Sequence, residues 1–291
     1  MSARQKYAAQ FYSGDIDQYI NEFITGEEMY EFNRPVAGVV PHAGWFFSGK
    51  TAAKVFDVFS MKYSDAKTVI LLGTVHNVGM VGKHTIYGSG AWETPLGDIS
   101  VDEELADMLD KELGSLAEIN NGSHDWEHSI EVQLPFVKYM FPDIRIVPIA
   151  VIPAHDSKDV GTKIAETIKK NDYSAFVIGT TDLTHYGPNY GFSPAGKGEK
   201  ALKWMHKNDR SIIDLVLTME ADKIIDEAKE NRNACGSGAL SATIGYAKEM
   251  GAKKGILLDY ITSHEVYSEG DFKMGVGYAG IVFPEDHSIV I

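Results

Sequence analysis

The chain of 291 residues has little cysteine, few basic residues and no long apolar run, and each shortage argues against a class of protein. Its one cysteine, Cys235, cannot form an internal disulfide, which argues against a disulfide-rich secreted fold. Acidic residues outnumber basic ones by 41 to 27, and a formal net charge of −14 argues against binding to nucleic acid or to an anionic membrane. No run approaches the ~18 apolar residues of a membrane span, and residues 1–15 lack the apolar segment of a signal peptide. We therefore expect a soluble protein of a reducing cytoplasm.

The residues that are present predict a single α/β domain over residues 1–291. The contents of hydrophobic residues (44%) and charged residues (23%) are those of a globular protein. Continuous apolar runs, typical of strands buried on both faces, occur at Val36–Val40, Thr68–Leu72, Ile144–Val151, Ala175–Gly179, Gly255–Ile261 and Val276–Phe283. Stretches with helical character lie between them, at Ser48–Phe59, Asp102–Leu113, 128–140, 157–170, 197–218 and 237–250. The alternation predicts a three-layer fold with a central mixed or mainly parallel sheet and helices on both faces.

Three of the predicted strands end in a loop that contains a histidine. His42 follows Val36–Val40, His76 follows Thr68–Leu72, and His185 follows Ala175–Gly179. Ligands of α/β sheets bind beyond the carboxyl ends of the strands, and neutral imidazole is the commonest protein ligand of transition metals. We therefore predict that His42 and His76 share a metal ion, with a third ligand from elsewhere in the chain.

Cys235 lies in a glycine-rich turn before the predicted helix 237–250. The positive end of a helix dipole favours thiolate, the form of cysteine that binds metal. A buried cysteine that packs as a small apolar residue is an equally good interpretation of the sequence alone.

Two further segments carry groups suited to acid–base chemistry. His124 and His128 have the H-x-x-E-H spacing of inverted zinc peptidases, but the same segment also fits a helix start with acidic residues in its first turn. Asp182 and His185 fit either a hydrogen-bonded loop or a carboxylate that orients a proton-shuttling histidine.

The remaining histidines and several aromatic residues have weaker signals. We assign no functional role to the histidines whose sequence context is unremarkable, His84, His155, His206, His264 and His287. The aromatic residues that could line a pocket, or belong to the core or to a rim, are Trp45, Phe46, Trp92 and Tyr186.

A set of short motifs, in order along nearly the whole chain, resembles the Memo family, whose bacterial and archaeal members are known as protein B of the AmmeMemoRadiSam system. The motifs are Ala8–Tyr12, Pro41–Gly44 with Ser48–Gly49, Leu72–His76, Thr94–Gly97, Glu127–Glu131 with Gln133–Pro135, Asp182–His185 and Cys235–Gly236. This family is similar to the class III extradiol dioxygenases, non-haem iron enzymes that open catechol rings.

The resemblance implies a role for each matching residue. His42 and His76 match the two histidine ligands of the family's metal, and Cys235 matches the third ligand, where the dioxygenases have a glutamate. His185 matches the acid–base histidine, with Asp182 beside it. His128 and Glu131 match further polar residues of the cleft. Asn77 departs from the pattern, because many members have a second histidine there.

These observations lead to several hypotheses about function. The first is a dioxygenase-like oxidoreductase that holds Fe²⁺ on His42, His76 and Cys235 and acts on an aromatic or phenolic small molecule. A thiolate ligand also suits copper or zinc, and it can itself be oxidised. The alternatives are therefore a metal-carrying or redox-sensing protein that binds a peptide or partner, and a zinc hydrolase. A hydrolase with Cys235 as nucleophile and His185 as base is a further alternative. The oligomeric state is left open by the sequence, a homo-oligomer included.

Overall fold

The computed structural model describes residues 3–12, 14, 16–24, 32–63, 66–76, 82–268 and 270–286. In these residues nine strands form one sheet in the order β10-β11-β1-β8-β2-β7-β3-β6, with β9 paired to β11. The strands of this sheet are β1 (Pro35–Val40), β2 (Thr68–Gly73), β3 (His84–Ile86), β6 (Ala117–Ile119), β7 (Arg145–Ala150), β8 (Ala175–Thr180), β9 (His185–Tyr186), β10 (Ile256–Thr262) and β11 (Gly275–Pro284). A separate pair consists of β4 (Ala91–Trp92) and β5 (Ile99–Ser100).

The centre of the sheet is parallel and its edges are mixed. Strands β1, β8, β2 and β7 pair in parallel, whereas β11 runs antiparallel to both β1 and β10, and β3 runs antiparallel to β7. Every residue of β1, β2 and β8 is buried, as expected of parallel strands covered on both faces.

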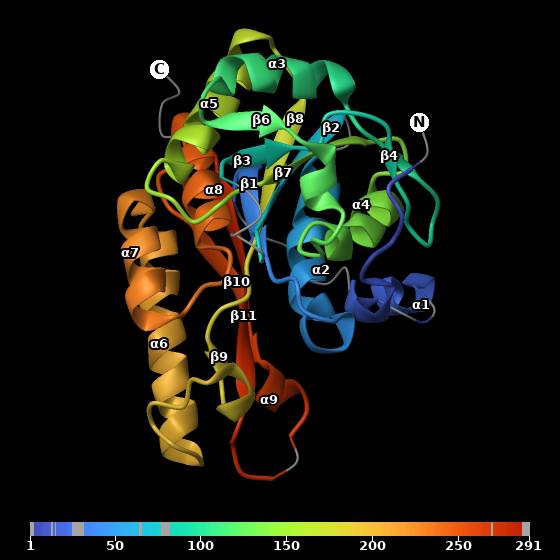
Figure 1. The fold of residues 1–291 in the computed structure, drawn as a ribbon. Coiled ribbons are helices and arrows are strands. Elements are labelled where there is room, and N and C mark those ends of the chain that lie inside the picture. The colour runs from blue at the N-terminus through green and yellow to red at the C-terminus, as the bar shows by residue number, and fades with distance from the viewer. Residues whose placement is uncertain are drawn as a thin grey trace.

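Helices cover both faces of the sheet (Figure 1). One apolar core lies between the sheet and α1 (Ile16–Phe23), α2 (Trp45–Lys62) and α4 (Leu134–Met140). The core on the other face includes residues of α3 (Glu103–Leu113), α5 (Ser157–Lys170), α6 (Glu199–Leu217), α7 (Ala221–Asn231) and α8 (Ser237–Glu249). The short α9 (Ser263–Val266) lies near β9 at the lower end in Figure 1. The predicted three-layer α/β fold is therefore confirmed, and none of the described helices has the length and apolar character that crossing a bilayer requires.

The predicted helix 128–140 begins later than expected. Residues Glu131–Gln133 form a 3-10 turn, and the α-helix α4 starts only at Leu134, with Pro135 in its first turn. The cause is Glu127, whose carboxylate accepts the backbone N–H groups of His128 and Ser129 and so holds the chain in a turn. Sequence patterns also gave no signal for α1, α7, α9 and the short strands β3, β4, β5, β6 and β9.

Helices α5 and α8 pack with their backbones in contact, because glycines line the crossing. A Cβ on Gly161 would lie 1.7 Å from the carbonyl oxygen of Ala242, and one on Gly245 would lie 2.2 Å from that of Lys158. This crossing fixes α8 against α5, and it therefore fixes the amino-terminal end of α8, just after Cys235.

We predict that Gly161→Ala destabilises the protein by at least about 2 kcal/mol, because the added methyl group must push the two helices apart. Gly82→Ala is the control, since a Cβ at Gly82 meets nothing within 4 Å. Urea denaturation monitored by circular dichroism measures both, and equal midpoints for the two variants would contradict the close crossing.

Candidate metal centre

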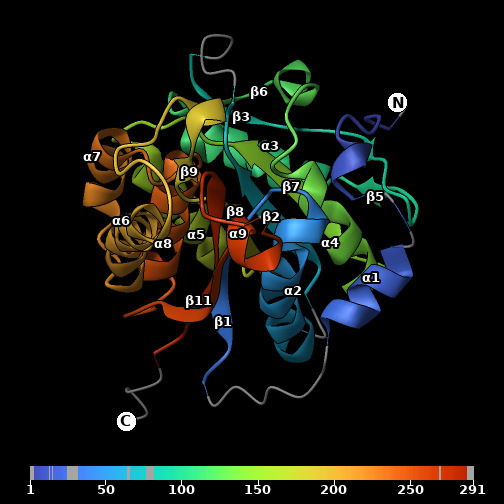
Figure 2. The ribbon, with the colours of Figure 1, turned by 90° about the horizontal axis from the view of Figure 1, so that it is seen from below.

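The parallel register brings three predicted site loops to one end of the sheet. Val40 of β1 lies opposite Thr180 of β8, and Gly179 of β8 lies opposite Leu72 of β2. The loops that follow contain His42, Asp182 and His76, so all three begin at the same level. Figure 2 views the molecule from this end, with β9 and α9 in the foreground.

Cys235 reaches this end from the start of α8. Its backbone N–H donates to the carbonyl oxygen of Asp182 (3.2 Å), and its own carbonyl oxygen accepts from the Thr74 hydroxyl (2.9 Å). The next residue, Gly236, lies so close to β8 that a Cβ there would be 2.2 Å from the carbonyl oxygen of Thr180. The glycine is therefore what allows the cysteine loop to approach the strand ends.

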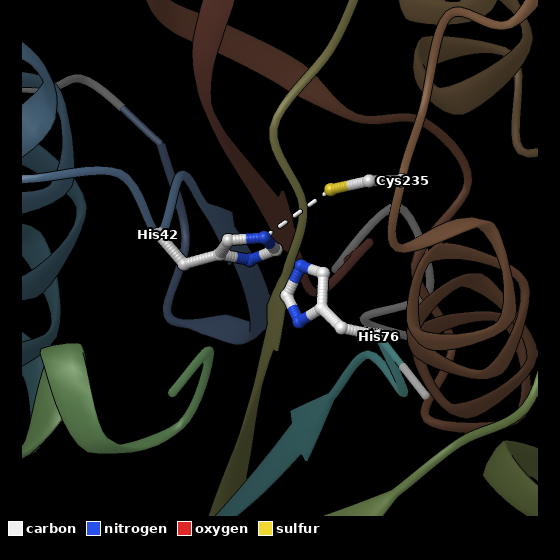
Figure 3. Close-up of side chains that lie close together, drawn as sticks. All are labelled: His42, His76 and Cys235. Carbon is white, nitrogen blue, oxygen red and sulfur yellow. Dashed lines mark hydrogen bonds between the residues drawn. The ribbon is translucent and has the colours of Figure 1, made fainter. Parts of the chain in front are cut away.

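His42, His76 and Cys235 point toward one another (Figure 3), and their potential ligand atoms all lie within 4.8 Å of each other. The Nε2 atom of His42 is 3.2 Å from the Sγ atom of Cys235, and the two histidine rings meet edge to face with centroids 5.3 Å apart. Two imidazoles and one thiolate are donors that iron, copper and zinc accept in proteins. The arrangement fits a metal ion with three protein ligands.

Burial keeps two of these ligands uncharged in the protein without metal. Burial, together with the neighbouring His76 and His128, holds the pKa of His42 well below its usual range, so this imidazole is neutral and ready to bind metal. Burial and the nearby Asp182 carboxylate raise the pKa of the Cys235 thiol far above its usual value. The thiol is therefore protonated at neutral pH, and a metal ion must displace its proton.

His76 is oriented by Glu127, a residue that sequence reasoning did not place in the site. The Nδ1 atom of His76 lies 2.9 Å from a carboxylate oxygen of Glu127, and the same carboxylate accepts the His76 backbone N–H. Burial opposes the charge on both groups, but their mutual hydrogen bond outweighs it: the pKa of His76 is raised and that of Glu127 is lowered. This contact leaves Nε2 of His76 for a metal, an arrangement common among metal-binding histidines. The sequence signals for Glu127 were its place in the H-x-x-E-H spacing and in the motif Glu127–Glu131, and neither indicated a contact with His76.

His128 packs in the same cluster. Its ring stacks on His76, with centroids 4.4 Å apart, and on Phe11, with centroids 4.8 Å apart. Burial, and then the neighbouring His76, lower the pKa of His128, so its ring is neutral at pH 7.

Asp182 and His185 enter the site separately. Asp182 accepts a hydrogen bond from the backbone N–H of His42 (2.8 Å) and so positions the loop of that ligand. His185 has its Nδ1 atom 3.0 Å from the carbonyl oxygen of Leu183, and its ring meets that of Tyr190 edge to face. These hydrogen bonds therefore join Asp182 to the backbone of His42 and His185 to the backbone of Leu183, rather than to each other. Burial raises the pKa of Asp182, although the nearby His185 opposes this.

The structure places Glu131 apart from the cavity, contrary to its expected role as a polar residue of the cleft. Its carboxylate is buried and forms an ion pair with Arg4 (2.8 Å). It also accepts hydrogen bonds from the backbone N–H groups of Tyr7 and Ala8 and from the hydroxyl of Tyr12. Glu131 thus anchors the amino-terminal segment, which carries Phe11 to the cavity.

A cavity of about 390 Å³ opens beside His42 and His76, and Cys235 is not among its lining residues. It is lined by Phe11, His42, Ala43, Phe47, His76, His128, Asp182, His185, Tyr190, Ser263, Met274, Gly275, Val276 and Tyr278. Most of its apolar lining was not predicted, because these residues lie far apart in the sequence and no sequence pattern indicates that they meet at one cavity.

Other candidate residues lie elsewhere. Trp45, Trp92 and Tyr186 are buried in the cores, whereas Phe46 is 59% exposed near the cavity mouth. His124 is buried against Tyr87 and Trp92 in a 3-10 turn, so it does not form a helical metal pair with His128.

The thiol of Cys235 lies beside His42 rather than His185, which does not favour the proposed cysteine–histidine nucleophile. Asn77 and His287 lie outside the described residues, and His84, His155, His206 and His264 are not among the residues that line the cavity.

Comparisons with known proteins give one consistent family. The model of the family described as "Memo-like protein" matches residues 4–282. A MEMO1 family protein of Thermococcus onnurineus is 36% identical over 289 residues, which cover 95% of this chain and 97% of that protein. A MEMO1 family protein of Pyrococcus furiosus is also 36% identical, over 97% of this chain and 99% of its own.

A solved structure supports the fold. The uncharacterized protein JW3007 from Escherichia coli K12 matches with a TM-score of 0.53 and covers 84% of this chain and 99% of its own. Its sequence identity is 12%, so this likeness concerns the fold alone.

The protonation states predict how metal affinity depends on pH. Since a bound metal displaces the Cys235 proton, the association constant should rise about tenfold per pH unit wherever His76 is already neutral. Below the raised pKa of His76 the slope should be steeper, because a proton must then also leave this imidazole. Calorimetry in buffers of different ionisation enthalpy counts the released protons, and a pH-independent affinity would exclude the thiol as a ligand.

We predict that Glu127→Gln lowers metal affinity by about 10- to 100-fold, since the neutral amide orients and polarises His76 less well. Asp125→Asn is the matched control, because it removes an exposed carboxylate two positions earlier. Competition with a chromophoric chelator measures both affinities. Equal values for Glu127→Gln and the unchanged protein, with unchanged circular dichroism, would show that Glu127 has no part in metal binding.

Proposed function

This chain belongs to the family of Memo-like proteins, and we propose that it binds one iron ion through His42, His76 and Cys235 and uses it to oxidise a phenolic small molecule with dioxygen. The observation that carries the proposal is the convergence of these three ligand atoms, two of which belong to His42 and His76, lining residues of a cavity that aromatic side chains also line. Three protein ligands leave positions on an iron ion for a chelating substrate and for dioxygen.

Iron, when bound, supplies the one-electron chemistry that lets dioxygen react with an electron-rich ring. Ring opening of the extradiol type breaks one carbon–carbon bond beside a hydroxyl-bearing carbon, and both atoms of dioxygen enter the product. No external reductant is needed, because the catechol supplies the electrons. The protein must then bind the ring, take up its hydroxyl protons and keep bulk water away.

His185 is suited to hold a proton from the substrate. A carbonyl oxygen can only accept a hydrogen bond, so the contact between Nδ1 and Leu183 places the ring proton on Nδ1. The other nitrogen, Nε2, then carries a lone pair that can accept a hydroxyl proton within the cavity that His185 lines.

His128 and Asp182 shape the same site. The neutral His128 ring is fixed by stacking on Phe11 and His76, and it adds a polar ring to the cavity lining. Asp182 acts through its hydrogen bond to the His42 backbone, so it is a positioning residue in this proposal.

A second candidate, a metal-carrying or redox-sensing protein, is favoured by one observation. The third ligand is a thiol that lies 3.2 Å from the imidazole of His42, and such soft donors also retain copper(I) or zinc. Oxidation of this thiol would remove a ligand and release the metal. The two candidates differ in turnover, since the carrier retains its metal without consuming dioxygen.

Oxygen uptake after anaerobic loading with Fe²⁺ tests the proposal with a panel of catechols. We expect uptake with at least one catechol. His185→Gln should keep the metal but lower the rate by about 10²- to 10⁴-fold, the usual effect of a lost acid–base group. Cys235→Ala should lose both metal and uptake.

His155→Gln is the matched control, because this histidine is exposed and does not line the cavity. It should leave metal content and rate unchanged. Full iron loading without uptake on any phenol would contradict the enzyme proposal and favour the carrier. Unchanged metal content in Cys235→Ala would contradict both.

A further inference from the structure

Exposed apolar side chains gather at the mouth of the cavity. Among the described residues nine large hydrophobic side chains are exposed, and five of them line the cavity or lie beside it. These five are Phe46, Phe47, Tyr190, Tyr267 and Met274. Such a concentration of exposed apolar surface beside a concave site is typical of a ligand-binding surface.

Four of these residues make up what we call the apolar rim: Phe46, Phe47, Tyr267 and Met274. Phe47 and Met274 line the cavity itself. The ring of Phe46 meets that of Phe47 edge to face, with centroids 4.9 Å apart, and lies 6.2 Å from that of Tyr267. The rim therefore extends the cavity wall outward from the metal ligands to the surface of the protein.

The charges of the lining restrict what can bind. Its titratable side chains are the four histidines, Asp182 and two tyrosines, and the described lining residues include neither lysine nor arginine. An anionic group on a substituent that lies at the outer part of the cavity would meet apolar side chains such as Phe47 and Met274, and no lysine or arginine of the described lining could pair with it. This disfavours a carboxylate or phosphate on the substituent.

We propose that the ligand of this site is a phenol with an uncharged, apolar alkyl or aryl substituent. Its ring lies at the metal, and its substituent lies on the apolar rim. The position of the ring rests on the proposed function. The position of the substituent rests on the contacts of the rim, and Phe46 is its outer specificity-determining residue.

Binding of three catechols under anaerobic conditions tests this inference. The probes are 4-methylcatechol, 4-butylcatechol and 3,4-dihydroxybenzoate, titrated by calorimetry into the ferrous and the metal-free protein. A buried methylene group raises affinity by about three- to fourfold, so 4-butylcatechol should bind at least about tenfold more tightly than 4-methylcatechol. The carboxylate should bind most weakly.

Phe46→Ser and Tyr267→Ser should each reduce the gain from the butyl group by about threefold or more and leave the affinity for 4-methylcatechol unchanged. Both side chains are more than half exposed, so neither change should unfold the protein. The control is Met61→Ser, which removes a side chain that is 52% exposed near the other end of α2. This variant should behave like the unchanged protein.

The outcomes separate this inference from the proposed function. An equal gain from the butyl group in the unchanged protein, Phe46→Ser and Tyr267→Ser would overturn the rim as a subsite. Equal affinity of 4-methylcatechol for the ferrous and metal-free forms would overturn the metal contact of the ring. The ratio of the affinities for 4-butylcatechol and 4-methylcatechol would still test the contact of the substituent with the rim. Failure of every catechol to bind either form would overturn both.

Discussion

The candidate metal centre depends on how closely the backbone at the start of α8 approaches the sheet. A Cβ on Gly236 would lie 2.2 Å from the carbonyl oxygen of Thr180, and one on Gly238 would lie 2.3 Å from that of Ile152. Because glycine occupies both positions, the preceding residue, Cys235, can lie in contact with the loops after β1 and β8. The histidines come from strand ends, whereas the cysteine comes from a helix start, and this packing is what joins the two.

The same packing gathers groups whose protonation states a bound cation would change. The imidazole of His42 is buried and the Cys235 side chain is partly buried; both are uncharged, and close to them lie two carboxyl groups, Asp182 and Glu127. A divalent ion would lower the pKa of the thiol and would favour the ionised forms of these carboxyl groups. Burial, which disfavours thiolate in the protein alone, therefore becomes favourable to metal binding once the ion supplies the opposite charge.

The fold and the end of the sheet that holds the candidate ligands could be predicted from the sequence, because both follow from local patterns. Buried parallel strands are continuous apolar runs, and their carboxyl ends share one edge, so His42 and His76 could be assigned to one end of the sheet. Hydrogen bonds between distant segments leave no such pattern. The roles of Glu127 and Glu131 were therefore not predictable, since one carboxylate orients a ligand and the other anchors residues more than a hundred positions away.

The anchoring by Glu131 explains why the amino-terminal segment belongs to the site. The buried ion pair with Arg4 and the hydrogen bond from Tyr12 fix both ends of a short segment, and Phe11 within it stacks on His128. A buried carboxylate is costly unless its partners satisfy it, so this segment cannot leave without exposing an unpaired charge. The position of Phe11 in the cavity wall therefore depends on the buried contacts of Glu131.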